Sequence, residues 1–163
     1  MDKDSVAPPV IAGLLVGIAL VVSFALQFGP AATFPPPKSI NNVVITLERT
    51  ACFGNCPDYS LIVYGNGTLF YEGRNFVDVT GRQSSNISQE HVQELVRAFY
   101  AKGYFTLQDE YSAPVTDLPT TTTSISIDGR YKKVINYYGA PEQLIELENM
   151  IDDIAKSERW VGR

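Results

Sequence analysis

The sequence predicts an α+β fold, in which a mainly antiparallel sheet of about five to six strands carries two amphipathic helices on one face, behind an N-terminal transmembrane helix. Three observations lead to this prediction. Two pairs of apolar segments are each joined by a turn-forming dipeptide, Asn66-Gly67 and Asp128-Gly129. Each pair is followed by a segment of helical periodicity, which favours helices packed on the same face of the sheet. A long apolar segment between Val10 and Phe28 precedes both pairs.

The apolar segment of residues 10–28 is long enough for a membrane span. No charge occurs between Asp4 and Lys38. A helix over residues 10–28 would be about 28 Å long, close to the hydrocarbon thickness of about 30 Å. A cleaved signal peptide and a buried core helix are the alternatives, but the chain does not start with a basic region and no A-x-A-like site follows. We therefore expect a retained signal-anchor.

The expected organisation has four parts: a short N-terminal tail (1–9), a transmembrane signal-anchor helix (10–28), a Pro-rich linker (29–42) and an extracytoplasmic α+β domain (43–163). The consecutive prolines Pro35 to Pro37 favour an extended linker. We expect a single-pass protein of the cell membrane whose C-terminal domain lies on the extracytoplasmic side, as is usual for an N-terminal signal-anchor. The membrane is then a partner through the N-terminal helix.

The first half of the domain predicts strands. Residues 43–50 are apolar and β-branched, as in a strand. Residues 58–73 predict a hairpin with a type I′ turn at Asn66-Gly67, because both residues tolerate positive φ. Residues 75–81 are expected to continue as a strand, and residues 82–86 to form a loop.

The second half predicts two helices and another hairpin. Residues 88–105 have the apolar spacing of an amphipathic helix, with Ser88 as its N-cap. An irregular loop over residues 106–119 leads to a second hairpin at residues 120–139. The last helix is expected over residues 140–160, where leucines and isoleucines recur along one face.

The only two cysteines, Cys52 and Cys56, are predicted to form a disulfide. Structural zinc needs four ligands, and the only histidine available is His91. A thioredoxin-like redox pair has two intervening residues instead of three, and a cysteine nucleophile would depend on His91 as its base. Gly54 and Asn55 turn easily and can bring the cysteines together. A disulfide implies an oxidising compartment, in agreement with the extracytoplasmic placement.

Three carboxylates in the irregular loop, Asp109, Glu110 and Asp117, are a possible ligand-binding group. Such oxygen ligands could hold Ca²⁺, or one of them could act as a general base, although the spacing fits no EF-hand and a solvated role is the default. Asn66 and Asn86 begin glycosylation sequons. The sequence predicts no catalytic residue, no metal site and no cofactor.

The charge balance argues against nucleic acid as a partner. The formal net charge is -5 and the pI is about 4.8. An acidic chain without a cluster of lysine and arginine repels a phosphate backbone.

The cysteine segment and its surroundings resemble a prokaryotic family known as domain of unknown function 6438. Its hallmark is a Cys-Phe-Gly-x-Cys-Pro-x-Tyr stretch, matched here by Cys52, Phe53, Gly54, Cys56, Pro57 and Tyr59. The resemblance extends over residues 43–161. It implies an exported or envelope-attached protein and transfers no activity and no catalytic residue.

These observations favour a membrane-anchored extracytoplasmic domain that acts as a non-enzymatic, ligand- or protein-binding module of the prokaryotic envelope. Its partner would be an envelope protein or a small polar ligand. One alternative is an enzyme or Ca²⁺-dependent module that uses the acidic loop 109–117. Another is a thiol redox protein that uses Cys52 and Cys56.

Overall fold

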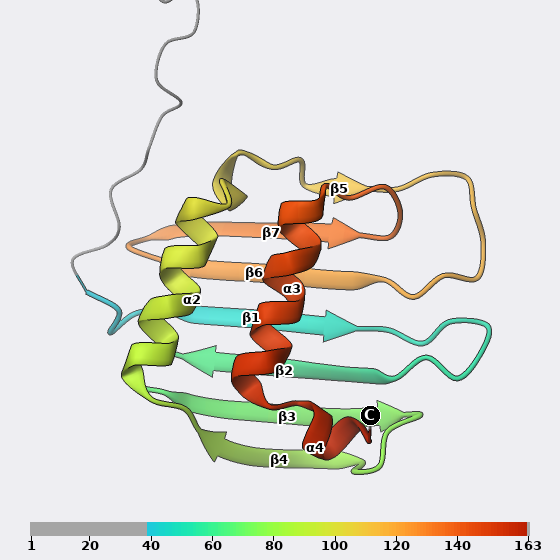
Figure 1. Ribbon diagram of the computed structural model, residues 1–163, viewed down its shortest axis with the longest axis horizontal. Coiled ribbons are helices and arrows are strands. Elements are labelled where there is room, and N and C mark those ends of the chain that lie inside the picture. The colour runs from blue at the N-terminus through green and yellow to red at the C-terminus, as the bar shows by residue number, and fades with distance from the viewer. Residues whose placement is uncertain (1–38, 163) are drawn as a thin grey trace, which may run out of the picture. The chain divides into compact units, whose positions relative to one another are not determined.

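The computed structural model describes residues 39–162, which form one seven-stranded sheet with helices on one face (Figure 1). The strand order is β4-β3-β2-β1-β6-β7-β5. The strands are β1 (Val44–Arg49), β2 (Asp58–Tyr64), β3 (Thr68–Asn75), β4 (Gly81–Asn86), β5 (Glu110–Tyr111), β6 (Thr121–Ile127) and β7 (Arg130–Asn136). The helices are α2 (Gln89–Ala101), the 3-10 helix η1 (Tyr104–Thr106), α3 (Glu142–Ala155) and α4 (Glu158–Val161).

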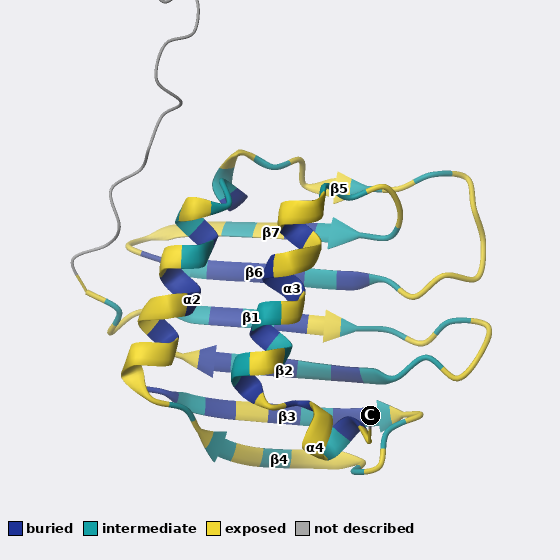
Figure 2. Ribbon diagram, in the orientation of Figure 1, coloured by how far each residue is buried: buried dark blue, intermediate teal, exposed yellow. Residues whose placement is uncertain are grey.

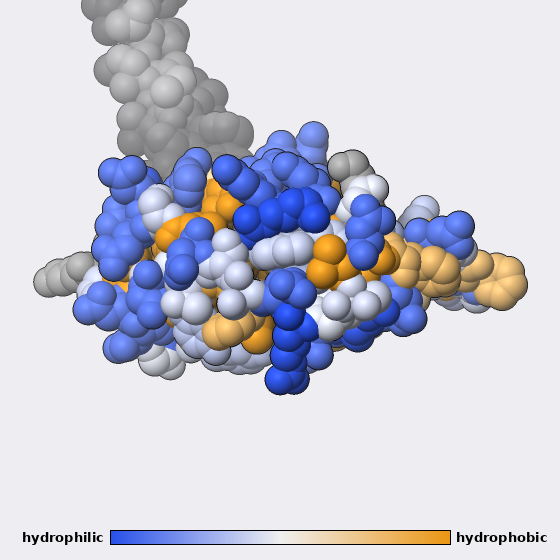
Figure 3. Space-filling model, turned by 90° about the horizontal axis from the view of Figure 1, so that it is seen from below, coloured by the Kyte–Doolittle hydropathy of each residue, from blue (hydrophilic) through white to orange (hydrophobic). Residues whose placement is uncertain are grey.

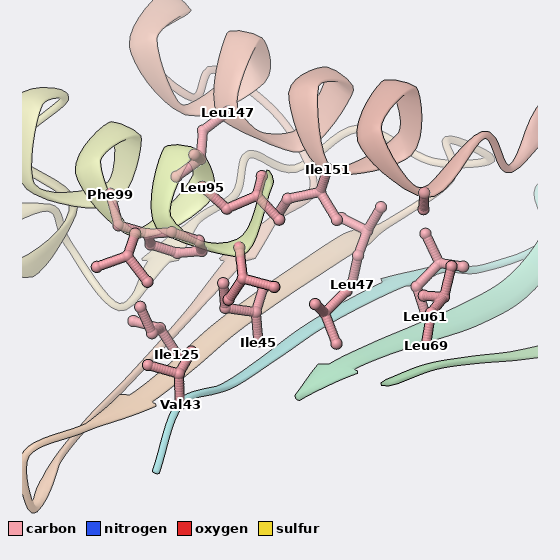
Figure 4. Packing of buried hydrophobic residues seen from close by; sticks show 14 of the residues in the cluster. Val43, Ile45, Leu47, Leu61, Leu69, Leu95, Phe99, Ile125, Leu147 and Ile151 are labelled. Carbon is pink, nitrogen blue, oxygen red and sulfur yellow. The ribbon is translucent and has the colours of Figure 1, made fainter. Parts of the chain in front are cut away.

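The core lies between the sheet and the helix pair α2 and α3. Alternate residues of the central strands, such as Ile45 and Leu47, point toward the helices and are fully buried (Figure 2). They meet the apolar stripes of the helices, where Leu95 and Ile151 are also fully buried (Figure 4). Each such aliphatic side chain contributes about 1.5–3 kcal/mol through burial. The alternation in the strands and the helical spacing together fix which face of each element is covered.

The two hairpins form where they were expected, but the first one turns differently. Asp128 and Gly129 both have positive φ and make a two-residue turn. In the first hairpin Val63 pairs with Leu69, and of the expected turn pair only Gly67 has positive φ. The amide of Gly67 bonds to the Tyr64 carbonyl, so the loop is a turn followed by a left-handed glycine. The prediction of a type I′ turn is therefore wrong for the first hairpin.

The predicted strand and loop after the first hairpin are interchanged in the structure. Strand β3 ends at Asn75, residues 76–80 form a loop, and the polar residues 81–86 form the edge strand β4. An edge strand needs only main-chain bonds to its neighbour, so it shows no apolar alternation. The apolar loop is instead held by other contacts: the Val79 amide bonds to the Trp160 carbonyl and the Val79 carbonyl accepts from Tyr71.

The expected fold class requires a correction in its sheet. Residues 39–162 form seven strands instead of five to six, and the sheet is mixed, because β5 pairs in parallel with β7. The two strands that the sequence did not predict, β4 and β5, lie at the two edges of the sheet (Figure 1). Strand β5 has two residues, too few for any periodicity to show in the sequence. The α+β class and the placement of α2 and α3 on one face are as expected.

The transmembrane helix in the expected fold class is not supported. Residues 10–28 lie outside the residues that the structure describes. Among residues 39–162, no helix has both the length and the apolar character needed to cross a bilayer. The fold class that the structure supports is the mixed sheet with its covering helices.

The predicted last helix is divided in two. Helix α3 ends at Ala155, Lys156 has φ of 52°, and α4 begins at Glu158. The Lys156 and Ser157 amides bond back to carbonyls of the last turn of α3, which closes that helix. The break turns α4 toward β3, where Trp160 stacks on Tyr71 with ring centroids 4.7 Å apart.

Candidate functional site

A cavity of about 320 Å³ opens where β1 ends and β2 begins, against the end of α3 and the start of α4. Arg49 and Tyr59 reach it from the sheet. Both belong to the inward-facing set of their strands, and they are direct partners in the β1–β2 register. Residues of the two helices complete the wall, namely Asn149, Asp152, Asp153, Ser157, Glu158 and Val161.

Arg49 and Asp152 form an ion pair in the wall of this cavity. Nε and Nη2 of Arg49 both lie 2.9 Å from Oδ2 of Asp152. Nη1 donates to Oγ1 of Thr121 at 3.1 Å, and Nη2 donates to Oδ1 of Asn149 at 3.2 Å. Burial lowers the pKa of Arg49, but the adjacent Asp152 outweighs it and the pKa is raised. The guanidinium therefore stays charged, with its donors directed at protein acceptors.

The carboxylate of Asp152 is fully engaged as an acceptor. Its Oδ1 accepts from the Tyr59 hydroxyl and from the Ser157 hydroxyl, each at 2.7 Å. With the two contacts from Arg49, this fills about four acceptor positions of a carboxylate. Burial and then the Asp152 charge raise the pKa of Tyr59, so its hydroxyl remains a donor. Asp152 is therefore a structural acceptor that binds α3 to β1 and β2, and it has no lone pair left to take a proton from a substrate.

A buried carboxyl, Glu148, lies one turn before the partly buried Asp152 on α3. Glu148 is 2 % exposed, and both its oxygens accept from Nδ2 of Asn136, at 2.9 and 3.3 Å. Burial raises the pKa of Glu148 to about 7, against the lowering effects of Asn136 and Arg49. Thr123 lies beside it and also lowers this pKa, although its buried hydroxyl makes no hydrogen bond of normal geometry with any described residue.

The disulfide between Cys52 and Cys56 is present, as predicted. The two Cα atoms are 5.4 Å apart, and the Gly54 amide donates to Cys52 Sγ at 3.2 Å. The disulfide loop, residues 50–57, joins the ends of β1 and β2, so it starts and finishes at the cavity. Phe53, between the cysteines, is 88 % exposed. Figure 3 shows a hydrophobic tip projecting at this end of the molecule.

The three carboxylates singled out in the sequence lie away from the cavity wall. Asp109, Glu110 and Asp117 are all exposed. Asp109 makes a short ion pair with Lys132 of β7. Glu110 is the first residue of β5, and Asp117 lies in the loop after it with φ of 70°. Within residues 39–162, no group of three or more histidine, cysteine, aspartate or glutamate side chains is placed to hold a metal ion.

Sequence reasoning missed the polar residues that the fold brings together. Arg49 follows Ile45 and Leu47 in the inward-facing alternation of β1, so its position signals a charge directed at the core. Glu148 and Asp152 share the helical face of Ile151, where apolar residues are expected. A charged residue at a core-facing position was the sequence signal that could have indicated this polar network. Its partners could not be read from the sequence, because they lie far along the chain.

The fold and site define a small α+β domain in which one helix is joined to a mixed sheet by a partly buried polar network, beside a short disulfide loop. The chain belongs to the family described as Domain of unknown function (DUF6438), whose model matches residues 43–155. The comparison with curated proteins gave no match.

Proposed function

We propose that this protein is a non-enzymatic binding module that takes a protein partner at the loop end of its sheet. The loop end is the end that carries residues 50–57, 76–80, 112–120 and 137–141 (Figure 1). The observation that carries the proposal is Phe53, a large apolar side chain that is 88 % exposed on a loop closed by a disulfide. Further exposed apolar side chains occur at the same end, namely Phe76, Val115, Leu118 and Tyr138.

Single exposed apolar residues are common on protein surfaces, but Phe53 differs in how it is held. The Cys52–Cys56 bond and the Gly54 amide contact restrict the loop before any partner arrives. Restricting a loop in advance reduces the entropy that binding must otherwise remove. Aromatic side chains presented in this way are frequent anchors of protein interfaces.

The saturated polar network supports binding over catalysis. Arg49 and Asp152 direct their donors and acceptors at each other and at neighbouring side chains. Ser157 donates to the same carboxylate, which is already shared with three other donor contacts and is a poor base for activating it. Both cysteines are in the disulfide, which leaves no thiolate for a nucleophile.

The rim of the cavity suggests the chemistry of the partner. Asp153 and Glu158 line the cavity, are exposed, and have no ion-pair partner among the described residues. A partner segment with an apolar residue for Phe53 and a lysine or arginine for these carboxylates would match both features. The alternative is a small cationic ligand that binds in the same cavity of about 320 Å³.

The disulfide supports placing this interaction in an oxidising compartment outside the cytoplasm. A prokaryotic envelope protein is then the kind of partner that we propose.

The test is a quantitative pull-down with the full-length chain from envelopes of its own organism, with three baits: wild type, Phe53→Ala and Tyr131→Ala. Tyr131 is 67 % exposed near the opposite end of the sheet and is the matched control. We expect a partner whose binding falls about 30-fold with Phe53→Ala, as for an interface anchor, and is unchanged with Tyr131→Ala. Equal recovery with all three baits would contradict the proposal. So would a turnover by the purified protein that Asp117→Ala abolishes. Binding of a small cation that requires Asp153 and not Phe53 would favour the small-ligand alternative.

A further inference from the structure

Glu148 is a buried acid that the proposed function leaves unexplained. It lies on α3 directly after Leu147, in the helical face that packs on the sheet, and is 2 % exposed. A carboxylate removed from water needs strong compensation to remain ionised. The compensation available to Glu148 determines whether it carries a charge or a proton.

The compensation around Glu148 is weak. Its one hydrogen-bond donor of normal geometry is the neutral amide of Asn136 on β7. No lysine, arginine or histidine among residues 39–162 lies within ion-pair distance of it. Arg49 of β1 is the cation that faces it, and Arg49 is already bonded to Asp152.

The other titratable groups near Glu148 add no positive charge. Asp152, one turn further along α3, is a second carboxylate and opposes ionisation of Glu148. Tyr104 of η1 also faces it, but its hydroxyl donates to the Thr123 carbonyl at 2.6 Å, and burial raises its pKa. On β6, the Thr123 hydroxyl is a neutral group beside Glu148, and it makes no hydrogen bond of normal geometry with any described residue.

We propose that Glu148 is a proton-operated latch, which holds helix α3 on the sheet when protonated and loosens it when ionised. The protonated carboxyl is neutral and has an O–H that can donate to Thr123 Oγ1 while its carbonyl oxygen accepts from Asn136. Among the described residues, the ionised carboxyl faces only neutral hydrogen-bond donors, the Asn136 amide and the Thr123 hydroxyl, together with the carboxylate of Asp152. The first state satisfies the buried groups and the second leaves a buried charge poorly compensated.

The direction of the pH dependence follows from the pKa. Burial raises the pKa of Glu148 from its ordinary 4.5 to about 7 in the folded protein. The folded state therefore holds the proton more tightly than the unfolded state does. This contribution to stability is fully present below about pH 4.5 and is lost as the pH rises through about 7. Over that window the unfolding equilibrium constant should rise about tenfold per pH unit.

The latch also regulates the loop end, and this step rests on the proposed function. Asn149 and Asp152 follow Glu148 on α3 and bond to Arg49 in the cavity wall. When α3 loosens, these contacts loosen with it, so partner binding should weaken as the pH rises. If no partner depends on Phe53 but the stability still follows the pH as described, the proposed function fails and the latch stands.

The experiment compares urea unfolding of the full-length chain at several values from about pH 5 to about pH 8. Fluorescence of Trp160, the only tryptophan, reports unfolding because its ring stacks on Tyr71. Wild type should become less stable with rising pH in this range, and Glu148→Gln should lose most of that dependence. Glu142→Gln, an exposed position on the same helix, should keep the wild-type dependence. Equal pH dependence in wild type and Glu148→Gln would overturn the proposal.

A second measurement does not require the variant to fold. The side-chain carboxyl carbon of Glu148 can be followed by NMR in the wild-type protein as the pH is changed. A midpoint near 7 supports the latch. A midpoint at or below the ordinary value of 4.5 would show that the buried carboxyl is ionised throughout and would overturn it.

Discussion

The two ends of the sheet reverse the chain in different ways. At the turn end, β2 passes to β3 through residues 65–67, and β6 passes to β7 through Asp128 and Gly129. At the loop end, the connections run through residues 50–57, 76–80 and 112–120 (Figure 1). The exposed apolar residues of the connecting segments, such as Phe53, belong to the loop end.

The difference lies in what holds each end together. The turn end depends on the main chain: φ is positive at Gly67, Asp128 and Gly129, and the Gly65 amide donates to the Val43 carbonyl. The loop end depends on side-chain contacts between distant residues, such as the Arg49–Asp152 ion pair, together with one disulfide. Because partly buried side chains hold the loop end together, the exposed residues of its loops can change without loss of the fold. A binding surface requires this freedom.

The largest expected loss of stability comes from removing the Arg49–Asp152 ion pair in the cavity wall at the loop end. Arg49→Ala leaves Asp152 without its cation, at a site where both side chains are mostly buried, and should cost about 3 kcal/mol of unfolding free energy. Arg82→Ala is the control, because the Arg82–Glu72 pair is exposed and its loss should cost under about 0.5 kcal/mol. Urea unfolding followed by circular dichroism measures both. A similar cost for the two variants would show that the ion pair does not hold the loop end.

The next effect tests how tightly the turn end is packed. A Cβ added at Gly65 would lie 1.7 Å from the Ile40 carbonyl oxygen, so Gly65→Ala should cost about 2–3 kcal/mol through forced backbone movement. The same change at Gly54 meets only Cys52 Sγ at 3.7 Å and should stay within about 0.5 kcal/mol. Thermal unfolding of the two variants against wild type measures the difference. If Gly54→Ala proves the more damaging, the contrast between the ends is incorrect.

Removing the disulfide should have a moderate effect, confined to the loop end. Cys52→Ser with Cys56→Ser should cost about 2 kcal/mol, because a short closed loop restricts the unfolded chain only slightly. Amide hydrogen exchange should rise in residues 50–57 and stay unchanged in α2. Faster exchange throughout α2 would mean that the disulfide supports the whole domain.

The smallest effect separates the two asparagines of the connecting segments. Oδ1 of Asn66 accepts from the Thr68 amide at 3.0 Å, so Asn66→Ala should cost about 1 kcal/mol. Asn55→Ala in the disulfide loop should change the stability by under about 0.5 kcal/mol, because Asn55 is exposed. Chemical unfolding curves of the two variants, measured in parallel, give the comparison. Equal costs would show that the Asn66 side-chain contact does not distinguish the turn at residues 65–67 from the disulfide loop.

The sequence by itself determined the features that depend on neighbouring residues. The hairpins, the capped helix α2 and the disulfide all rest on patterns within a few residues, such as Ser88 Oγ accepting from the His91 amide. The family also followed from a local stretch around Cys52 and Cys56, and the family model matches residues 43–155. The side-chain periodicity within one segment is enough to predict its conformation and which of its faces is buried.

Only the tertiary structure decided the edges of the sheet and the polar network of the cavity. Strand β4 has no apolar alternation and β5 has two residues, so each becomes a strand only because a neighbour offers main-chain partners. Arg49 and Asp152 are 103 positions apart, and their pairing depends on how α3 crosses the sheet. Contacts between such distant residues leave no local pattern in the sequence, because packing alone brings them together.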